Sequence, residues 1–256
     1  MNITIVGTLL GLLMAAIPLY VFYVVGAKSL RTLLLSVVRM LTQMAFASFY
    51  LYWLYGHANG WLAALWLLLM VLLTVVLVLP RSRLRPKLMF LPVTGSLLMS
   101  TLIVGFYLLT AVLRVDDALS VRWLVPVMGT LLAIEGETCP LLLREYFVGL
   151  KRFSSTYYYH LGNGKPWWQA EMPMLRRSFE RGFVRMTRQM APAGLLLLPL
   201  LLTGQLLGGV DVLSAAAATV MLILGGLCAS VLTLLFVVVV SHRFFIDNRG
   251  KLTIDR

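Results

Sequence analysis

Long apolar runs alternate with short polar breaks along this chain of 256 residues. Because about 20 apolar residues in helical conformation cross the hydrocarbon core of a bilayer, such runs predict membrane-spanning helices. Seven runs approach or exceed this length: 3–26, 32–55, 61–80, 88–113, 123–149, 193–209 and 213–240. The pattern predicts an all-α fold, a polytopic membrane helix bundle of about seven transmembrane helices in one domain, 1–256.

Two of these runs differ from the others. The first has no basic residue before it and is longer than the apolar core of a signal peptide, so we expect a retained helix. The sixth is short and contains Pro199, Gly204 and Gln205, which favour a broken or re-entrant helix.

The composition excludes a soluble domain. Hydrophobic residues make up 60% of the chain and charged residues 12%. In soluble domains about half of the residues are apolar and about a quarter are charged. The mean hydropathy of the chain is +0.90. The formal net charge of +12 does not indicate nucleic-acid binding, because the basic residues lie between apolar runs, where membrane topology accounts for them.

The distribution of Lys and Arg orients the bundle. With the N-terminus outside, the inner side receives nine basic residues between Arg144 and Arg188, four in the tail and six in the first two inner loops, hence 19 of the 22; those six are Lys28, Arg31, Arg81, Arg83, Arg85 and Lys87. By the positive-inside rule we expect the C-terminus in the cytoplasm of a multi-pass protein of the inner (plasma) membrane.

Three charged residues fall inside the apolar runs. Glu135 and Glu137 lie near the middle of run 123–149, where an acidic side chain costs about 2.5–3.5 kcal/mol on insertion scales. Arg39 lies at a matching depth in the second run. We therefore expect Arg39 to pair with Glu137 or Glu135, as a structural lock or as a gate that opens during transport.

Helical spacing groups the side chains around these glutamates. Met128, Glu135, Thr138 and Cys139 share one stripe, while Glu137 and Arg144 share another. Carboxylate, thioether and thiol ligands suit a transition metal such as iron, so Glu135 and Cys139 are candidate metal ligands. Ordinary packing explains a Met stripe equally well. Two prolines in the same run predict a kink or break.

The segment 151–191 is polar and aromatic, and we expect it in the cytoplasm. Its apolar positions recur at three- and four-residue steps, which predicts an amphipathic helix: Met172, Leu175, Phe179, Phe183 and Met186. Such a helix lies on anionic lipid or docks a cytoplasmic partner. The turn 162–166 lacks the spacing of a nucleotide-binding Walker loop, and no nucleophile with a base at a recognisable spacing indicates an enzyme.

The chain also resembles a known family, the FetB/YbbM-type permeases of ABC transporters, called iron exporters in bacteria. The resemblance runs through a register of positions: Leu161, Gly162, Pro166, Gln169, Ala170, Arg176, Ser178, Gly194, Leu195, Leu198, Pro199, Gly204, Gly209, Asp211, Ala215 and Met221. Upstream, Arg39 and Gln43 resemble the family's Arg-x-x-x-Gln pair, and Val125-Pro126-Val127 with Gly129 resembles its Ile-Pro-Ile-x-Gly start. The family has an acidic residue where Arg188 stands and Tyr-Gln where Ala218-Thr219 stand, so the chain is a divergent relative.

The resemblance implies a homodimeric permease that is joined to two copies of a separate ABC ATPase. ATP and Mg²⁺ would then bind the ATPase, and no cofactor would bind this chain. The expected ATPase-docking residues are Leu161, Gly162, Pro166, Gln169, Arg176, Arg177 and Arg181. The expected substrate pathway contains Arg39, Gln43, Met128, Glu135, Glu137 and Cys139. The substrate would be a metal ion such as iron, or another small solute.

Two other functions fit the same residues. A self-sufficient ion channel or secondary carrier would use Glu135, Glu137 and Arg39 without ATP. A non-transporting scaffold would use the amphipathic segment to recruit partners.

Overall fold

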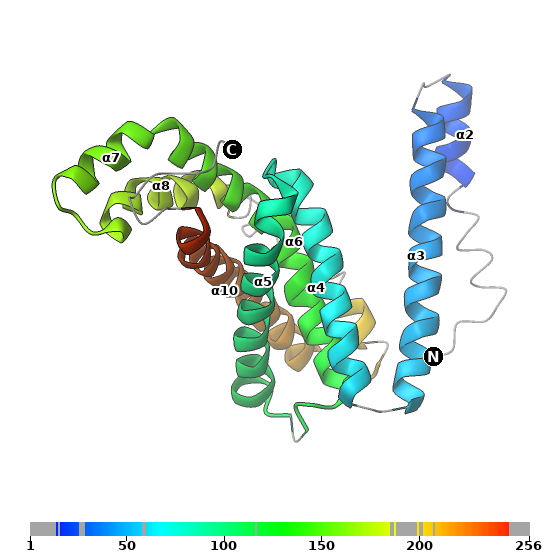
Figure 1. Ribbon diagram of the computed structural model, residues 1–256. Coiled ribbons are helices and arrows are strands. Elements are labelled where there is room, and N and C mark those ends of the chain that lie inside the picture. Colours follow the sequence, from blue (N-terminus) through cyan, green and yellow to red (C-terminus); the bar gives the residue numbers. More distant parts are fainter. Residues whose placement is uncertain are drawn as a thin grey trace. The chain divides into compact units, whose positions relative to one another are not determined.

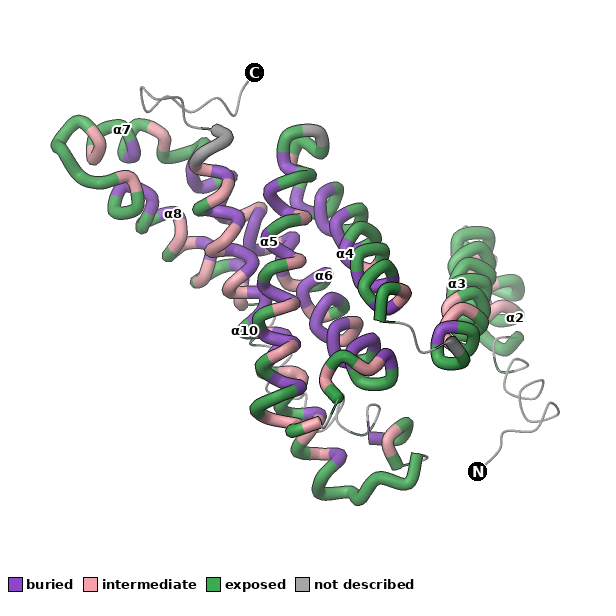
Figure 2. Tube along the Cα trace, turned by 60° about the horizontal axis from the view of Figure 1, so that its bottom comes forward, coloured by how far each residue is buried: buried purple, intermediate pink, exposed green. Residues whose placement is uncertain are grey.

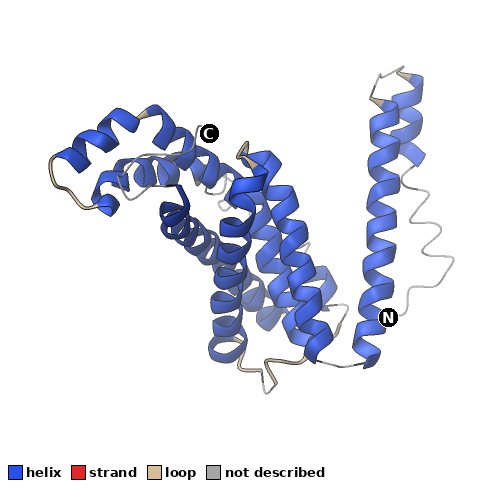
Figure 3. Cartoon of the chain, viewed as in Figure 1, coloured by secondary structure: helices blue, strands red, loops and turns tan. Residues whose placement is uncertain are grey.

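The computed structural model describes residues 14, 16–25, 29–57, 60–115, 117–184, 187, 199, 202–206 and 208–245. Throughout these residues the regular structure is helical and contains no strand, as Figure 3 shows. They cluster into two compact units, Met1–Asn59 and Gly60–Arg256, which are described one at a time. The predicted all-α fold class is confirmed.

The first unit contains α2 (Ala16–Val24) and α3 (Leu30–His57), which contact each other. Arg39 and Gln43 lie one turn apart on α3, and both are exposed. Their spacing of four residues places them on one face of the helix.

The second unit is a bundle built around α6 (Val121–Arg152). This helix contacts α4 (Gly60–Ser82), α5 (Pro86–Tyr107) and α10 (Val212–Phe245). Two shorter helices, α7 (Ser154–Gly162) and α8 (Trp167–Gly182), follow α6 and lie at one end of the bundle, here named the α8 end (Figure 1). The bundle therefore has a spanning part and a helical platform at one end.

Local sequence explains where several helices begin. Pro86 opens α5, where a missing backbone N–H costs nothing. The Asp211 carboxylate accepts the backbone N–H of Leu213 at 3.1 Å and of Ser214 at 3.4 Å, which caps α10. Gly164 has a φ of 74° in the turn between α7 and α8, a conformation that favours glycine.

Close helix contacts in the bundle rely on glycine. A Cβ on Gly226 of α10 would lie 2.8 Å from Cβ of Ile134, and one on Gly225 would collide with Leu108. On α5, a Cβ on Gly105 would collide with Met128. Because small residues let helix backbones approach closely, these glycines set the distances of α10 and α5 from α6.

Large apolar side chains also cover the outside of the bundle. Figure 2 shows buried residues between the helices and exposed residues on their outer faces. On α4 the exposed side chains include Leu65, Leu69, Leu73 and Val76. A continuous apolar outer face suits lipid as the surrounding solvent.

Five helices in the described residues are long and apolar enough to cross a membrane: Leu30–Gly56, Gly60–Ser82, Leu88–Val112, Val121–Arg152 and Val212–His242. They match the predicted runs 32–55, 61–80, 88–113, 123–149 and 213–240. The predicted runs 3–26 and 193–209 lie mostly outside the described residues. The predicted break in the fifth run is absent, because α6 continues as one helix through Pro126 and Pro140.

Basic residues gather at the α8 end. The connection between α4 and α5, the last turns of α6, and α8 all lie there (Figure 1). Their basic residues are Arg81, Arg83, Arg85, Arg144, Lys151, Arg152, Lys165, Arg176, Arg177 and Arg181. At the opposite end, Arg114 and Arg122 lie in and after the connection between α5 and α6. This asymmetry is the one that the positive-inside rule requires if the α8 end is cytoplasmic.

Candidate functional site

A buried carboxylate lies in the middle of the spanning bundle. Glu135 of α6 is fully buried, and its Oε1 accepts hydrogen bonds from Ser100 at 2.9 Å and Thr233 at 2.7 Å. Its Oε2 accepts a hydrogen bond from Thr101 at 2.8 Å. Hydroxyl groups of α5 and α10 therefore hold the carboxylate from both sides of α6.

Further polar side chains extend this site by one turn. The hydroxyl oxygens of Thr138 and Ser230 lie 2.6 Å apart. The buried Cys139 thiol lies within hydrogen-bonding reach of the Thr233 and Ser230 side chains. We name the following set the hydroxyl cluster: Ser100, Thr101, Glu135, Thr138, Cys139, Ser230 and Thr233. It joins α5, α6 and α10 through polar contacts inside an apolar bundle.

The predicted stripe of α6 does face this interior. Met128, Glu135 and Cys139 are buried, while Thr138 is half-buried. Met128 packs against Gly105 two turns away from the carboxylate and does not contribute a sulfur ligand beside it. Among the residues that the structure describes, no three His, Cys, Asp or Glu side chains come together as a metal site. Glu135 and Cys139 therefore remain candidate metal ligands whose polar neighbours are hydroxyls.

Sequence reasoning missed the hydroxyl groups that surround Glu135. Ser100 and Thr101 lie in an apolar run, as do Ser230 and Thr233 at a spacing of three residues. Single Ser and Thr side chains in membrane helices commonly donate a hydrogen bond to a backbone carbonyl of their own helix, so their presence alone predicts no functional site. The spacing of Ser230 and Thr233, which places them on one face of their helix, was the available signal.

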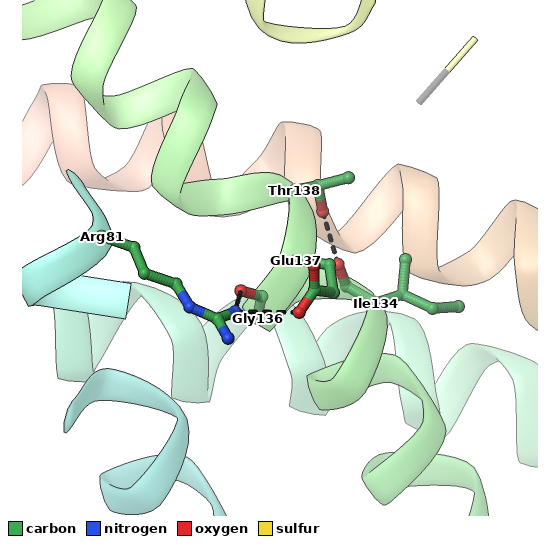
Figure 4. Close-up of polar contacts among 5 residues, drawn as sticks. All are labelled: Arg81, Ile134, Gly136, Glu137 and Thr138. Atoms are coloured by element: carbon green, nitrogen blue, oxygen red, sulfur yellow. Dashed lines mark hydrogen bonds and ion pairs between the residues drawn. The ribbon is translucent and has the colours of Figure 1, made fainter. Parts of the chain in front are cut away.

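Glu137 faces the opposite side of α6, where it meets a basic residue. Arg81 Nη1 of α4 donates to Glu137 Oε1 at 2.8 Å and lies 3.5 Å from the carbonyl oxygen of Gly136 (Figure 4). A cavity of about 430 Å³ is lined by this pair and by Arg144, which confirms the shared stripe of Glu137 and Arg144. The predicted partner Arg39 belongs to the other unit, so its pairing with Glu137 stays a prediction. Arg81 was missed because it directly follows the predicted run 61–80.

The helix α8 packs on α6 through a face that includes three small residues. Its buried face consists of Ala170, Glu171, Met174, Ser178 and Gly182. The Ser178 hydroxyl donates to the carbonyl oxygen of Leu142 at 2.6 Å. A Cβ on Gly182 would lie 3.1 Å from Cα of Leu142. These contacts fix α8 closely against the last turns of α6.

The predicted apolar stripe of this helix is a different face. Met172 is 46% exposed, and Leu175, Phe179 and Phe183 are half-buried. Met186 lies outside the described residues. The predicted helix is present, and its buried side carries other residues than the predicted apolar stripe. The role of the stripe on lipid or on a cytoplasmic partner stays a prediction.

One buried carboxylate ties α8 to two spanning helices. Glu171 accepts a hydrogen bond from the Tyr146 hydroxyl of α6 at 2.8 Å, and His242 Nδ1 of α10 lies 3.3 Å from its other oxygen. The His242 ring stacks on Trp167 at 4.0 Å between centroids. Burial raises the pKa of Glu171 above its ordinary value, although the hydrogen bonds from Tyr146 and His242 act in the opposite direction. Burial and then the charge of Glu171 raise the pKa of Tyr157 to about 12.

The predicted docking residues lie along the end of α7 and the outer side of α8. Gly162, Pro166, Gln169, Arg176 and Arg181 are exposed, and Leu161 is half-buried.

Arg177 differs from this set. Its side chain is only 17% exposed, lies 3.7 Å from Glu145 of α6, and covers the ring of Phe153. Arg177 therefore holds α8 to the bundle, while the other members stay accessible.

The raised pKa of Glu171 predicts a pH-dependent stability. The folded chain binds this proton more tightly than the unfolded chain, so stability is fully present below about pH 4.5 and is lost as pH rises through the raised folded-state pKa. Glu171→Gln should reduce this loss of stability, as measured by thermal unfolding in detergent at a series of pH values from about 4.5 upward. The control Glu180→Gln changes an exposed carboxylate of the same helix. Equal pH slopes for the wild type and Glu171→Gln would contradict this assignment.

The contact of Arg81 with Glu137 predicts a charge-swap rescue. Because both side chains are half-exposed, Arg81→Glu or Glu137→Arg should each cost about 1 kcal/mol or less, a drop of about 2–4 °C in the unfolding midpoint. The double variant Arg81→Glu/Glu137→Arg should recover most of the lost stability, because it restores a pair of opposite charges. Rescue by Arg39→Glu/Glu137→Arg, with none by the first swap, would instead establish Arg39 as the partner.

Comparison with known proteins gives a family. The model of the family UPF0014, described as an uncharacterised protein family, matches residues 5–246. A protein of Synechocystis sp. described as UPF0014 membrane protein slr1647 is 27% identical over 251 residues, which is 97% of this chain and 95% of the relative. No solved structure matches the chain. Because the family match spans nearly the whole sequence, the chain belongs to the UPF0014 family of membrane proteins.

Proposed function

We propose that this chain is the membrane-spanning permease subunit of an ABC transporter of the inner membrane, energised by a separate cytoplasmic ATPase. The arrangement of α8 carries the proposal. Its buried face is packed on and hydrogen-bonded to α6, and Glu171 links it to α10 as well. A partner that moves α8 would therefore move two spanning helices together.

The accessible side of α8 has the chemistry of a docking surface. Exposed Arg176 and Arg181 alternate with apolar Met172 and half-buried Phe179. Mixed basic and aromatic surfaces favour binding of a protein with an acidic rim. ATP and Mg²⁺ would bind that partner, and two copies of this chain would form the permease, as the resemblance implies.

The docking proposal predicts a loss of ATPase binding. Arg176→Glu together with Arg181→Glu should weaken the complex with the ATPase of the same host by roughly tenfold or more, since reversed rim charges repel the partner. The measurement is co-purification and ATPase stimulation with full-length chains in mild detergent. The matched control, Arg114→Glu with Arg122→Glu, reverses two charges at the opposite end and should leave binding unchanged. Equal loss in both variants, or no bound ATPase with either, would overturn the docking surface.

The transported solute that we propose is a metal ion such as iron. Carboxylate and thiol at the hydroxyl cluster support this proposal, because they are ligands that divalent transition metals accept. Transport through the bundle would bring the ion to Glu135 and Cys139 once the helices separate.

Metal transport should therefore depend on these two ligands. In vesicles that contain the permease and its ATPase, Glu135→Ala with Cys139→Ala should lower ATP-driven iron accumulation about tenfold or more, since two ligands are lost. The control Cys228→Ala removes the exposed thiol of α10. Unchanged accumulation in the double variant would exclude this metal pathway. Flux without ATP would instead favour a self-sufficient channel or carrier.

A further inference from the structure

Pro140 leaves one carbonyl oxygen of α6 without its usual hydrogen bond. A proline inside a helix has no N–H to donate, so the carbonyl oxygen of Gly136, four residues earlier, receives nothing from position 140. Arg81 Nη1 of α4 lies 3.5 Å from this oxygen and donates to Glu137 Oε1 at 2.8 Å, as Figure 4 shows. These two acceptors hold the Arg81 guanidinium between α4 and α6.

A second guanidinium in the same cavity has no acidic partner. Arg144 of α6 lines the cavity of about 430 Å³ together with Arg81 and Glu137, and the other lining residues, Pro140 and Leu141, carry no charge. Arg144 is half-buried. Among the residues that the structure describes, its side chain forms no ion pair, although a guanidinium has five N–H donors. Two positive charges and one negative charge therefore leave the cavity lining with a net positive charge.

The cavity lies at the depth of lipid headgroups. Trp61, which is 85% exposed, lies in the first turn of α4, and Arg81 lies in its last turn. Their positions differ by 20 residues, which corresponds to about 30 Å along a helix, the thickness of the hydrocarbon core. Exposed Trp is typical of a membrane interface, so Arg81 lies at the other interface, on the side of the α8 end. The charge asymmetry assigns that side to the cytoplasm, where the leaflet contains anionic lipids.

An exposed apolar stripe of α4 leads from Arg81 toward the middle of the membrane. Leu77 and Leu73 precede Arg81 by four and eight residues, so the three side chains lie along one side of the helix. Leu77 is 49% exposed and Leu73 is 56% exposed. A lipid whose headgroup enters the cavity can lay an acyl chain on these leucines. This stripe favours a lipid over an anion dissolved in water, which has no apolar part to bury.

We propose that Arg81 and Arg144 bind the phosphate group of an anionic phospholipid, whose acyl chain lies on Leu77 and Leu73. Guanidinium N–H groups form strong, charge-assisted hydrogen bonds to phosphate oxygens. Basic pockets between membrane helices on the cytoplasmic side bind such headgroups. The phosphate supplies the negative charge that Arg144 lacks within the described chain. The bound lipid also joins α4 to α6 beside the contact of Arg81 with Glu137.

Native mass spectrometry of the whole chain in mild detergent tests the headgroup. Phosphatidylglycerol is titrated in parallel with zwitterionic phosphatidylcholine that has the same acyl chains. We expect the wild type to bind phosphatidylglycerol more tightly, and Arg144→Ala to weaken this binding about tenfold, since one of two guanidiniums is lost. The control Arg122→Ala removes an exposed basic residue at the opposite end of α6 and should leave binding unchanged. Equal binding of the two lipids, no loss in Arg144→Ala, or equal loss in Arg122→Ala would overturn the site.

A second variant separates lipid binding from misfolding. Glu137→Gln removes the one acidic side chain of the cavity lining and keeps an oxygen that can accept from Arg81. Phosphatidylglycerol should bind this variant several-fold more tightly, because the repulsion between carboxylate and phosphate is gone. Misfolding cannot produce such a gain. Unchanged or weaker binding would contradict the proposal.

Inorganic phosphate distinguishes the lipid from a free anion. In large molar excess it should not displace phosphatidylglycerol from the wild type, because only the lipid also covers Leu77 and Leu73. Complete displacement would identify a free phosphate as the occupant and overturn the lipid assignment. None of these measurements requires an ATPase, so their failure leaves the proposed permease function intact, and failure of ATPase docking leaves this site intact.

Discussion

The hydrocarbon core of a bilayer offers no hydrogen bonds, and this constraint organises the second unit around α6. Two polar side chains that α6 carries into the bundle find partners on neighbouring helices. Glu135 binds the hydroxyls of α5 and α10, and Thr138 meets Ser230 of α10. Because these partners come from different helices, satisfying one helix's polar groups also fixes the arrangement of the other two.

The same requirement continues at the α8 end, where polar contacts replace apolar ones. Tyr146 of α6 and His242 of α10 converge on Glu171, and Ser178 reaches the backbone of α6. The platform is thus attached to the ends of the two helices that also hold the hydroxyl cluster. A displacement at the platform has a direct mechanical route along α6 and α10 toward Glu135, without a flexible connection between them.

Apolar run length was sufficient to predict the five long apolar helices among the described residues, because a helix that crosses a membrane must cross a core of fixed thickness. The charge pattern likewise predicted which connections lie together at the α8 end. The contacts of the two glutamates were not predictable in the same way. Depth along the helix suggested Arg39 as the partner of a glutamate. The actual partner also depends on which helix lies beside α6 and on how each helix is rotated about its axis. Arg81 of α4 occupies the side that Glu137 faces. Nor does hydrophobicity alone identify the packed face of α8, because that face includes Ser178 and Gly182, which allow a close approach to α6.

Glu135 and Glu137 show why rotation decides more than depth. Two residues along an α-helix turn the side chain by about 200°, so neighbours of equal depth point to opposite sides. Glu135 therefore meets hydroxyls in a fully buried cluster, and Glu137 meets a guanidinium beside an open cavity. A guanidinium always carries its charge and only donates hydrogen bonds, whereas a hydroxyl can donate or accept. Glu137 consequently meets a fixed positive charge, and Glu135 is surrounded by groups that can both donate and accept hydrogen bonds.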